Sequence, residues 1–172
     1  MDCILGRLVL VGQIFISLVS CVTTKASAPK ATVGANQGLL FFDSADSMRF
    51  VWPVRGVVSS TYGERNKRMH FGLDIKAPPG SPIVAVSNGR VLRSGWQTGY
   101  GNTLIIGHGS LLGLYAHCSK LIAKRGNLVN KGETVALVGR TGDATGNHLH
   151  FEVRSRLWTA LNPLDYLPLN WL

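Results

Sequence analysis

The feature that most constrains this chain is a series of short apolar or alternating runs, each bounded by turn residues. The runs span residues 56–60, 82–86, 90–96, 102–107, 113–117, 134–139 and 148–154. They are rich in Val, Ile and Leu, and their lengths are typical of β-strands. No apolar stripe of useful length has helical spacing, and 121–125 allows at most a turn. The pattern predicts an all-β domain of antiparallel strands, either a sandwich or a barrel.

Turn residues separate these runs. The chain has 20 glycines against 7 prolines, and the glycines follow no fixed period. Pro79-Gly80 and Lys131-Gly132 mark turns, and Asn88-Gly89 stands between two strand-like runs. Because Asn-Gly favours two-residue hairpin loops, this pair predicts a β-hairpin that joins 82–86 to 90–96.

The N-terminal segment has the pattern of a targeting sequence. Residues 8–20 form an apolar run after Arg7, with the length of a signal-peptide core and too short to span a bilayer. The run ends in Leu18-Val19-Ser20-Cys21, which resembles a bacterial lipobox. We expect residues 1–20 to be a lipoprotein signal peptide and Cys21 to carry the lipid. The alternative is a plain secretory signal with a chance cysteine near its end.

The next segment is typical of a tether. Residues 21–48 are rich in Thr, Ala, Ser, Gly and Asn and have neither strand nor helix periodicity. The apolar patch at 39–42 could dock on the domain that follows. We therefore expect a lipidated flexible tether over 21–48 and one globular domain over 49–172.

The charge of the chain is strongly basic, at +9 from 18 Lys and Arg against 9 Asp and Glu. Such a surface attracts polyanions. No nucleic-acid-binding motif accompanies the charge, so we expect no nucleic-acid partner. An anionic envelope polymer and a merely soluble basic surface both remain open. After loss of residues 1–20, Cys21 and Cys118 are the remaining cysteines, and with Cys21 acylated no disulfide framework is available.

The histidines form tight motifs. His70 and Asp74 lie in H-x-G-x-D, His148 and His150 form H-x-H, and Tyr115-Ala116-His117 is Y-x-H. On an extended chain, residues two or four apart share one face. Two histidines and one aspartate make a three-ligand zinc set with a fourth position left for water. H-x-H alone is a weak signal, but three such pairs on rigid strands predict a metal site.

Many motifs of the chain resemble the lysostaphin/LytM family of zinc metallopeptidases, which act on peptidoglycan. The resemblance runs from Trp52 to about Leu167, in the family's order. The matching pieces are Trp52-Pro53-Val54, SSTYG (59–63), HFGLDI (70–75), APPGSPIVAV (77–86), GYGNTLIIGHG (99–109), YAHCS (115–119), VGRTGDATGNHLHFEVR (138–154) and NPLDYL (162–167). The resemblance implies a barrel-sandwich hybrid of antiparallel sheets, Zn²⁺ as cofactor and hydrolysis of peptide cross-links.

Carried over by position, the resemblance assigns roles to five residues. His70, Asp74 and His150 would be the zinc ligands, and His117 and His148 the two catalytic histidines that do not bind the metal. With no H-E-x-x-H motif to supply a glutamate base, a neutral histidine can take the proton of the attacking water. We expect His117 to be this general base and His148 to orient water or stabilise the oxyanion, although the two roles could be exchanged.

Three further residues are candidates for supporting roles. Glu152 shares a strand face with His148 and His150, so it either fixes a histidine tautomer or is an ordinary rim glutamate. Tyr115 either lines the cleft, where it could donate to the transition state, or packs in the core. His108 is expected to have a structural or supporting role and not to bind metal.

The family also contains degenerate members that activate cell-wall amidases. Such members usually lack ligands or catalytic histidines, whereas this chain keeps all five positions, so we favour the enzyme. Val22 after Cys21, in place of aspartate, favours the outer membrane within the envelope. D-alanyl–diaminopimelate cross-links then become the expected substrate, with glycine bridges the alternative. Division proteins or amidases are possible partners, and Asn36 in the tether could block the zinc, as upstream segments do in some relatives.

Overall fold

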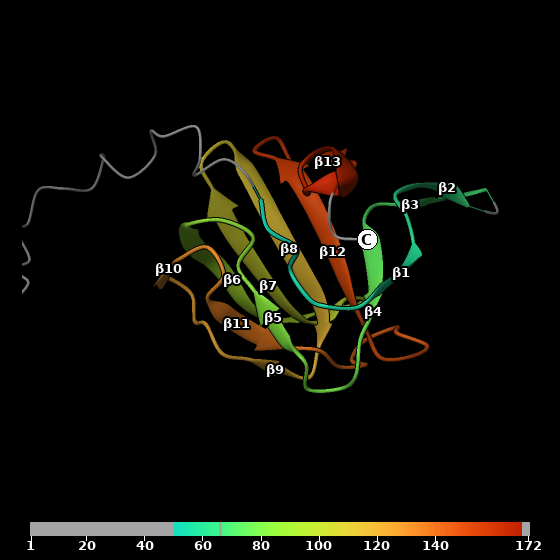
Figure 1. Cartoon of the computed structure of the whole chain (residues 1–172), viewed down its shortest axis with the longest axis horizontal. Helices are drawn as coiled ribbons and strands as arrows, with labels where there is room; N and C mark the ends of the chain where they lie inside the picture. Colours follow the sequence, from blue (N-terminus) through green and yellow to red (C-terminus); the bar gives the residue numbers. More distant parts are fainter. Residues whose placement is uncertain (1–49, 66, 170–172) are drawn as a thin grey trace, which may run out of the picture. The chain divides into compact units, whose positions relative to one another are not determined.

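The computed structural model describes residues 50–65 and 67–169, which form antiparallel β-sheets (Figure 1). The predicted signal peptide, Cys21, the tether with Asn36 and the apolar patch at 39–42 all lie outside the described residues. The helical structure of the described part is the single 3-10 turn η1 (Pro163–Asp165). In that part of the chain no helix has the length and apolar character needed to cross a membrane.

The main sheet has eight strands, and every pairing in it is antiparallel. Its order is β1-β4-β12-β8-β7-β6-β10, and β13 pairs with β12. The strands are β1 (Val57–Ser60), β4 (Leu73–Lys76), β6 (Gly89–Gln97), β7 (Gly101–His108), β8 (Leu111–Cys118), β10 (Leu128–Val129), β12 (His148–Ser155) and β13 (Ala160–Leu161). The long strands β6, β7, β8 and β12 provide its rigid centre.

Two smaller sheets complete the domain. One contains β5 (Pro82–Val84), β11 (Thr134–Leu137) and β9 (Lys120–Leu121), and the other is the hairpin of β2 (Gly63–Arg65) and β3 (Arg68–His70). Ile83 and Val135 from the three-stranded sheet share one buried cluster with Ile106 and Phe151 from the main sheet. The core therefore lies between these two sheets, which confirms the predicted all-β sandwich-type fold.

The predicted strand runs correspond to β1, β5, β6, β7, β8, β11 and β12, with ends that differ by a few residues. The strands that the pattern did not predict are β2, β3, β4, β9, β10 and β13, each of two to four residues. Alternation over so few residues is too short to recognise.

The predicted hairpin at Asn88-Gly89 is wrong. Strand β5 pairs with β11, whereas β6 pairs with β7 and β10, so the pair connects two different sheets. Asn88 holds this crossing in place: its side-chain Oδ1 accepts from Lys131 N at 2.8 Å and its carbonyl accepts from His108 Nδ1 at 3.0 Å. A Cβ at Gly89 would lie 2.5 Å from the Gly107 carbonyl oxygen, so only glycine fits this close approach.

The prediction that Tyr115 shares a face with His117 is also wrong. His117 has a φ of 60°, and the ladder between β7 and β8 shifts register between Asn102 and Leu104. These two irregularities break the alternation of side chains along β8. Tyr115 therefore lies in the core, fully buried and 5.2 Å from the ring of Phe151.

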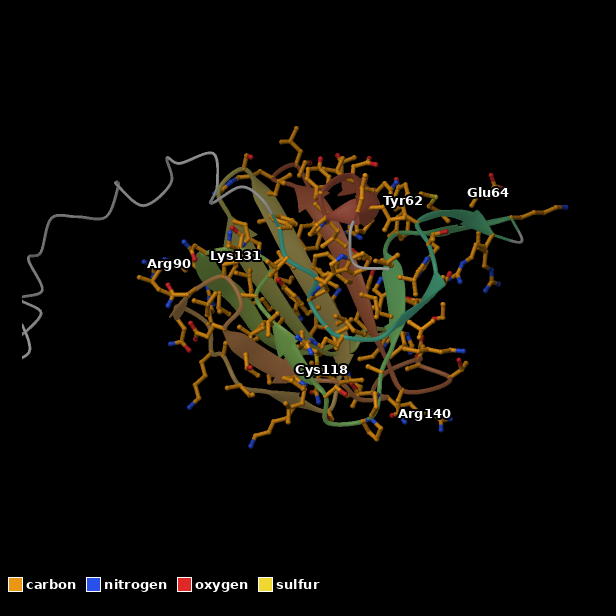
Figure 2. All side chains as sticks on the ribbon, in the orientation of Figure 1. Tyr62, Glu64, Arg90, Cys118, Lys131 and Arg140 are labelled. Carbon is orange, nitrogen blue, oxygen red and sulfur yellow. The ribbon has the colours of Figure 1, made fainter. Side chains whose placement is uncertain are left out.

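Tyr115 has buried polar partners there. Its hydroxyl accepts from Val86 N at 3.1 Å and lies 3.4 Å from His108 Nε2. Since His108 Nδ1–H donates to the Asn88 carbonyl, Nε2 is the acceptor for the tyrosine proton. His108 also packs edge-on against Phe50. Tyr115 and His108 thus have structural roles. Cys118, which Figure 2 labels, is buried in the same core, and burial raises the pKa of its thiol to about 12.

Replacing Tyr115 with Phe should destabilise the fold and leave metal binding unchanged. The substitution leaves the buried Val86 N–H and His108 Nε2 without their partner, which costs about 1–3 kcal/mol of unfolding free energy. Urea denaturation measures the change, and metal content is measured on the same sample. Loss of metal at unchanged stability would instead place Tyr115 at the cleft.

Candidate metal centre

Three predicted ligands come together at one end of the main sheet. His70 ends β3, Asp74 lies on β4, and His150 lies on β12 directly opposite Asp74 in the antiparallel ladder. Asp74 Oδ1 is 2.7 Å from His150 Nδ1 and 3.1 Å from His70 Nε2, and the two nitrogens are 3.2 Å apart. The ladder register therefore sets the positions of two of the three groups.

The chemistry and spacing of these atoms fit a zinc ion. A tetrahedral zinc with ligand bonds of about 2.0–2.1 Å holds its ligand atoms about 3.3 Å apart. The three candidate atoms lie within 4.8 Å of one another. Two imidazole nitrogens and one carboxylate oxygen also belong to the usual donor types of zinc.

Both histidines are held in the tautomer that metal binding requires. His70 Nδ1 lies 2.7 Å from the Thr61 carbonyl, which can only accept, so Nδ1 carries the proton and Nε2 has the lone pair. His150 Nε2 donates to Glu152 Oε1 at 3.0 Å, which leaves the lone pair on Nδ1. Each histidine thus turns its unprotonated nitrogen toward Asp74.

Glu152 supports His150 from a fully buried position. Its carboxylate accepts from His150, from the Tyr100 hydroxyl at 2.8 Å and from Arg154 Nε at 2.5 Å. Burial alone would raise the pKa of Glu152, but the hydrogen bonds from His150 and Arg154 outweigh it and hold the pKa below its usual value. Glu152 is therefore not a rim glutamate. Arg154 is fixed in turn, because its Nη1 donates to the Trp158 carbonyl at 2.8 Å.

The electrostatics of the cluster favour a positive charge between the carboxylates. Burial would raise the pKa of Asp74, but its hydrogen bond to His150 and the nearby charges of His150, His70 and His148 lower it overall. Burial would lower the pKa of His150, but hydrogen bonds to Asp74 and Glu152 raise it above its usual value. A site that stabilises a cation in this way also suits a metal ion.

His117 and His148 lie beside the three candidate ligands. Their ring centroids are 4.8 Å apart, and His148 Nε2 is 3.9 Å from Asp74 Oδ1. His117 Nδ1 donates to the Thr141 carbonyl at 2.8 Å and His148 Nδ1 to the Gly146 carbonyl at 2.9 Å. In the neutral rings Nε2 is therefore the unprotonated nitrogen. Burial is the main cause that lowers the pKa of His117.

The backbone at His117 is held in an unusual conformation. A non-glycine residue in the left-handed region carries a strain of about 1–3 kcal/mol and needs surroundings that fix it. The His117 amide donates to the Tyr100 carbonyl at 2.8 Å, and the His117 carbonyl accepts from the Thr141 amide. Thr141 Oγ1 donates to the Cys118 carbonyl at 2.9 Å and accepts from Asn102 N at 3.0 Å. This framework turns the His117 ring to the cleft and away from the core.

The five histidine and aspartate side chains open into one cleft of about 580 Å³. Several cleft residues were not predicted from the sequence, namely Arg65, Met69, Phe71, Tyr100, Asp143 and Thr145. Alternation along β12 could have indicated Arg154, since it follows His150 and Glu152 at two-residue spacing. No local pattern indicates Tyr100 or the carbonyls of Thr61, Thr141 and Gly146, which come from separate loops.

The family assignment agrees with this geometry. Residues 68–163 match the model of Peptidase family M23. The chain belongs to this family. It is similar to the lipoprotein YgeR of Escherichia coli, with 39% identity over 69% of this chain and 47% of YgeR. It is also similar to the murein hydrolase activator NlpD of Salmonella dublin, with 34% identity over 86% of this chain and 39% of NlpD.

A third relative is the DD-carboxypeptidase/endopeptidase Mpg of Neisseria meningitidis, with 40% identity over 56% of this chain and 24% of Mpg. The M23 chain thus spans less than half the length of these three curated relatives. Among solved structures, the catalytic domain of lysostaphin from Staphylococcus simulans aligns with a TM-score of 0.59 and 31% identity, over 63% of this chain and 89% of that domain. A zinc-containing peptidase from Vibrio cholerae aligns with a TM-score of 0.64 and 32% identity, over 70% of this chain and 41% of that one.

Replacing Glu152 with Gln should weaken zinc binding by about 10–100-fold, the usual effect of losing a group that orients a metal-binding histidine. The amide nitrogen of Gln would face Arg154 or His150, which are both donors. Zinc affinity can be measured by competition with a chelating dye. Glu64→Gln, at an exposed position of β2, is the control and should bind zinc normally. Equal affinity of both variants would contradict the role of Glu152.

Replacing Gly72 with Ala should displace His150. A Cβ at Gly72 would lie 2.5 Å from the Phe151 carbonyl oxygen and 2.9 Å from His150 Nε2, so β12 or the ring must move. We expect zinc affinity to fall by about tenfold or more, because the ring loses its orientation. Gly146→Ala is the matched control, since a Cβ there meets no atom within 4 Å. Unchanged zinc binding in Gly72→Ala would show that the His150 ring does not depend on the close approach of Gly72.

Proposed function

We propose that this M23 protein is a zinc-dependent endopeptidase that hydrolyses peptide cross-links of bacterial peptidoglycan. The observation that carries the proposal is the convergence of five groups in one cleft. His70, Asp74 and His150 present three donor atoms to one point, and His117 and His148 lie beside them with Nδ1 bonded to backbone carbonyls. The histidine pair would be unnecessary in a purely structural metal site, which is normally closed by four ligands.

The proposed roles follow from the tautomers. What zinc supplies when bound at such a site is polarisation of a peptide carbonyl and a water whose pKa is lowered to about 7. His117 Nε2 is unprotonated and takes the proton of the attacking water, while the Thr141 carbonyl keeps the ring oriented and stabilises the charge that it gains. His148 orients the water or, once protonated, stabilises the developing oxyanion. An exchange of these two roles would use the same atoms.

The substrate proposal rests on similarity and charge. The relative Mpg is named a DD-carboxypeptidase/endopeptidase, which favours D-alanyl–diaminopimelate cross-links over the glycine bridges of the lysostaphin type. The net charge of +9 favours association with anionic polymers of the envelope. We therefore propose D,D-endopeptidase activity for this cleft.

The proposed location is the cell envelope. The relative YgeR is named a lipoprotein, which supports lipidation at Cys21 after removal of residues 1–20. We propose that residues 21–48 tether the catalytic domain, 49–172, to a membrane, with the outer membrane favoured by Val22. Several acyl chains on one cysteine would anchor it stably, at about 0.8 kcal/mol per buried methylene.

One observation favours a second function. The similarity to the murein hydrolase activator NlpD covers 86% of this chain, more than the similarity to Mpg. A non-catalytic activator of a cell-wall amidase is therefore the alternative. The two functions differ in metal content and in products, because an activator releases no cleaved cross-links by itself.

The decisive test compares zinc content and muropeptide release for residues 28–172. Wild type should bind about one zinc per chain, and digestion of sacculi should release uncross-linked muropeptides. His150→Ala should lose the zinc and the activity, and His117→Ala should keep the zinc but lose the activity. His108→Gln is the matched control, because His108 lies outside the cleft, and it should remain active. Wild type that binds no zinc and releases nothing, yet stimulates an amidase, would favour the activator.

A further inference from the structure

A second feature of this chain lies away from the cleft, in a stretch without acidic residues. Between Asp74 and Glu133 the sequence contains no Asp or Glu. The same stretch carries seven basic residues: Lys76, Arg90, Arg93, Lys120, Lys124, Arg125 and Lys131. A surface built from this stretch alone therefore carries positive side chains and no carboxylates of its own.

The fold brings two parts of this stretch together at the edge of the main sheet. Strand β10 pairs with only two residues of β6, and Leu128 lies opposite Arg90 in that ladder. The preceding loop continues along β6: Gly126 N donates to the Val91 carbonyl at 2.8 Å, and Ser94 Oγ donates to the Ala123 carbonyl at 2.8 Å. Arg90, Leu92 and Arg93 lie on the side of β6 that faces away from the core residue Val91, and Leu128 extends this side as the ladder partner of Arg90. Together with the exposed loop residues Lys124 and Arg125 they form a surface that we call the β6 face.

The β6 face exposes large apolar side chains among its cations. Leu92 is 41% exposed and Leu128 67%. Leu92 lies over Gly107 of β7, where a Cβ would be 3.2 Å from Leu92 Cδ1. A cluster of exposed apolar residues on one face of a domain is uncommon and often marks an interaction site.

The cations of this face are available to an anionic partner. Arg90 donates to the Gly126 carbonyl at 3.0 Å and Arg93 to the Trp96 carbonyl at 3.0 Å, and both side chains remain exposed. Lys124 and Arg125 are exposed in the turn that follows Ala123. Within the described residues, none of these four side chains forms an ion pair with a carboxylate. Figure 2 shows Arg90 at the opposite end of the view from Tyr62 and Glu64.

We propose that the β6 face docks the domain onto a lipid bilayer with anionic headgroups. Arginines and lysines attract such headgroups, and leucines gain from burial at the boundary of headgroups and acyl chains. A hydrophilic polyanion would account for the cations but would give Leu92 and Leu128 no apolar environment. The mixture of both residue types on one face therefore favours a membrane over a polymer.

The docking has a consequence for the cleft. Strand β6 leads through Gln97 to Gly99 and Tyr100, which line the cleft. A bilayer contact along β6 would hold this rim at a fixed height above the membrane. The docking requires neither the bound zinc nor hydrolysis, so it can be tested whether or not the proposed function is correct.

The test uses residues 28–172, which contain all described core residues from Phe50 to Leu167. Binding is measured by co-sedimentation with vesicles of phosphatidylcholine, with or without about 30% phosphatidylglycerol to supply surface charge. Wild type should bind the anionic vesicles at least about tenfold more strongly than the neutral ones. Arg90→Gln with Arg93→Gln, and separately Leu92→Ser with Leu128→Ser, should each weaken that binding by about tenfold.

Two matched controls lie on other surfaces. Lys67→Gln with Arg68→Gln removes two charges from the hairpin of β2 and β3, and Leu157→Ser removes a side chain that is 91% exposed. Neither should reduce vesicle binding as strongly. Circular dichroism and thermal unfolding show that each variant is folded. If the control pair Lys67→Gln and Arg68→Gln weakens binding as much as Arg90→Gln and Arg93→Gln, the attraction is only net charge and the proposal fails.

Equal vesicle binding by Leu92→Ser with Leu128→Ser, together with charge-dependent binding to heparin, would assign the face to an anionic polymer. The absence of any vesicle binding would also overturn the proposal. The arginines would then serve to keep the open sheet edge from pairing with another chain.

Discussion

The antiparallel pairing of Asp74 with His150 is the constraint on which the candidate site depends. These residues are direct partners between β4 and β12, so their side chains leave the same face of the sheet at the closest cross-strand distance. A slip of one residue would turn one of them to the opposite face. The third group, His70, joins them because β3 ends three residues before β4 begins. The candidate metal centre is therefore a consequence of sheet register, which the core holds in place through Leu73, Ile75 and Leu149.

Around this pairing, every histidine of the cleft has its orientation fixed by an acceptor that cannot donate. Thr61, Thr141 and Gly146 contribute backbone carbonyls, and Glu152 contributes a buried carboxylate. A carbonyl has only lone pairs, so it selects one tautomer of the ring whatever the solution conditions, as long as the ring is neutral. The Glu152 arrangement is different, because a buried carboxylate is unfavourable unless it is neutralised and hydrogen-bonded. Arg154 and Tyr100 meet that requirement, and Phe71 and Trp158 lie on the guanidinium of Arg154.

Residue patterns predicted the longer strands and the groups that meet in the site, but not the local backbone. Strands such as β12 follow from alternation over eight residues, whereas β9 and β13 have two residues each and carry no periodic signal. Tyr115 was misplaced because side-chain alternation assumes a regular strand, and the left-handed His117 with its register shift interrupts β8. Asn88-Gly89 has the propensity of a hairpin turn, but it connects two different sheets. Long-range hydrogen bonds from Lys131 and His108 to Asn88 stabilise this connection. Tyr100 could not be predicted, because its contact with Glu152 joins residues 52 positions apart.

The layer behind the ligands bears on the choice between an enzyme and an activator. A domain that only binds a partner protein needs a complementary surface, and a buried ionic network beneath that surface adds little to it. Here the network of Glu152, Arg154 and Tyr100 lies behind His150 and holds its ring through the hydrogen bond to Glu152. The strained His117 backbone likewise orients a ring that is not among the three candidate ligands. Each feature is by itself unfavourable for stability. Each is explained if a proton acceptor and a metal ligand must be held in fixed positions. This supports the enzyme over the activator.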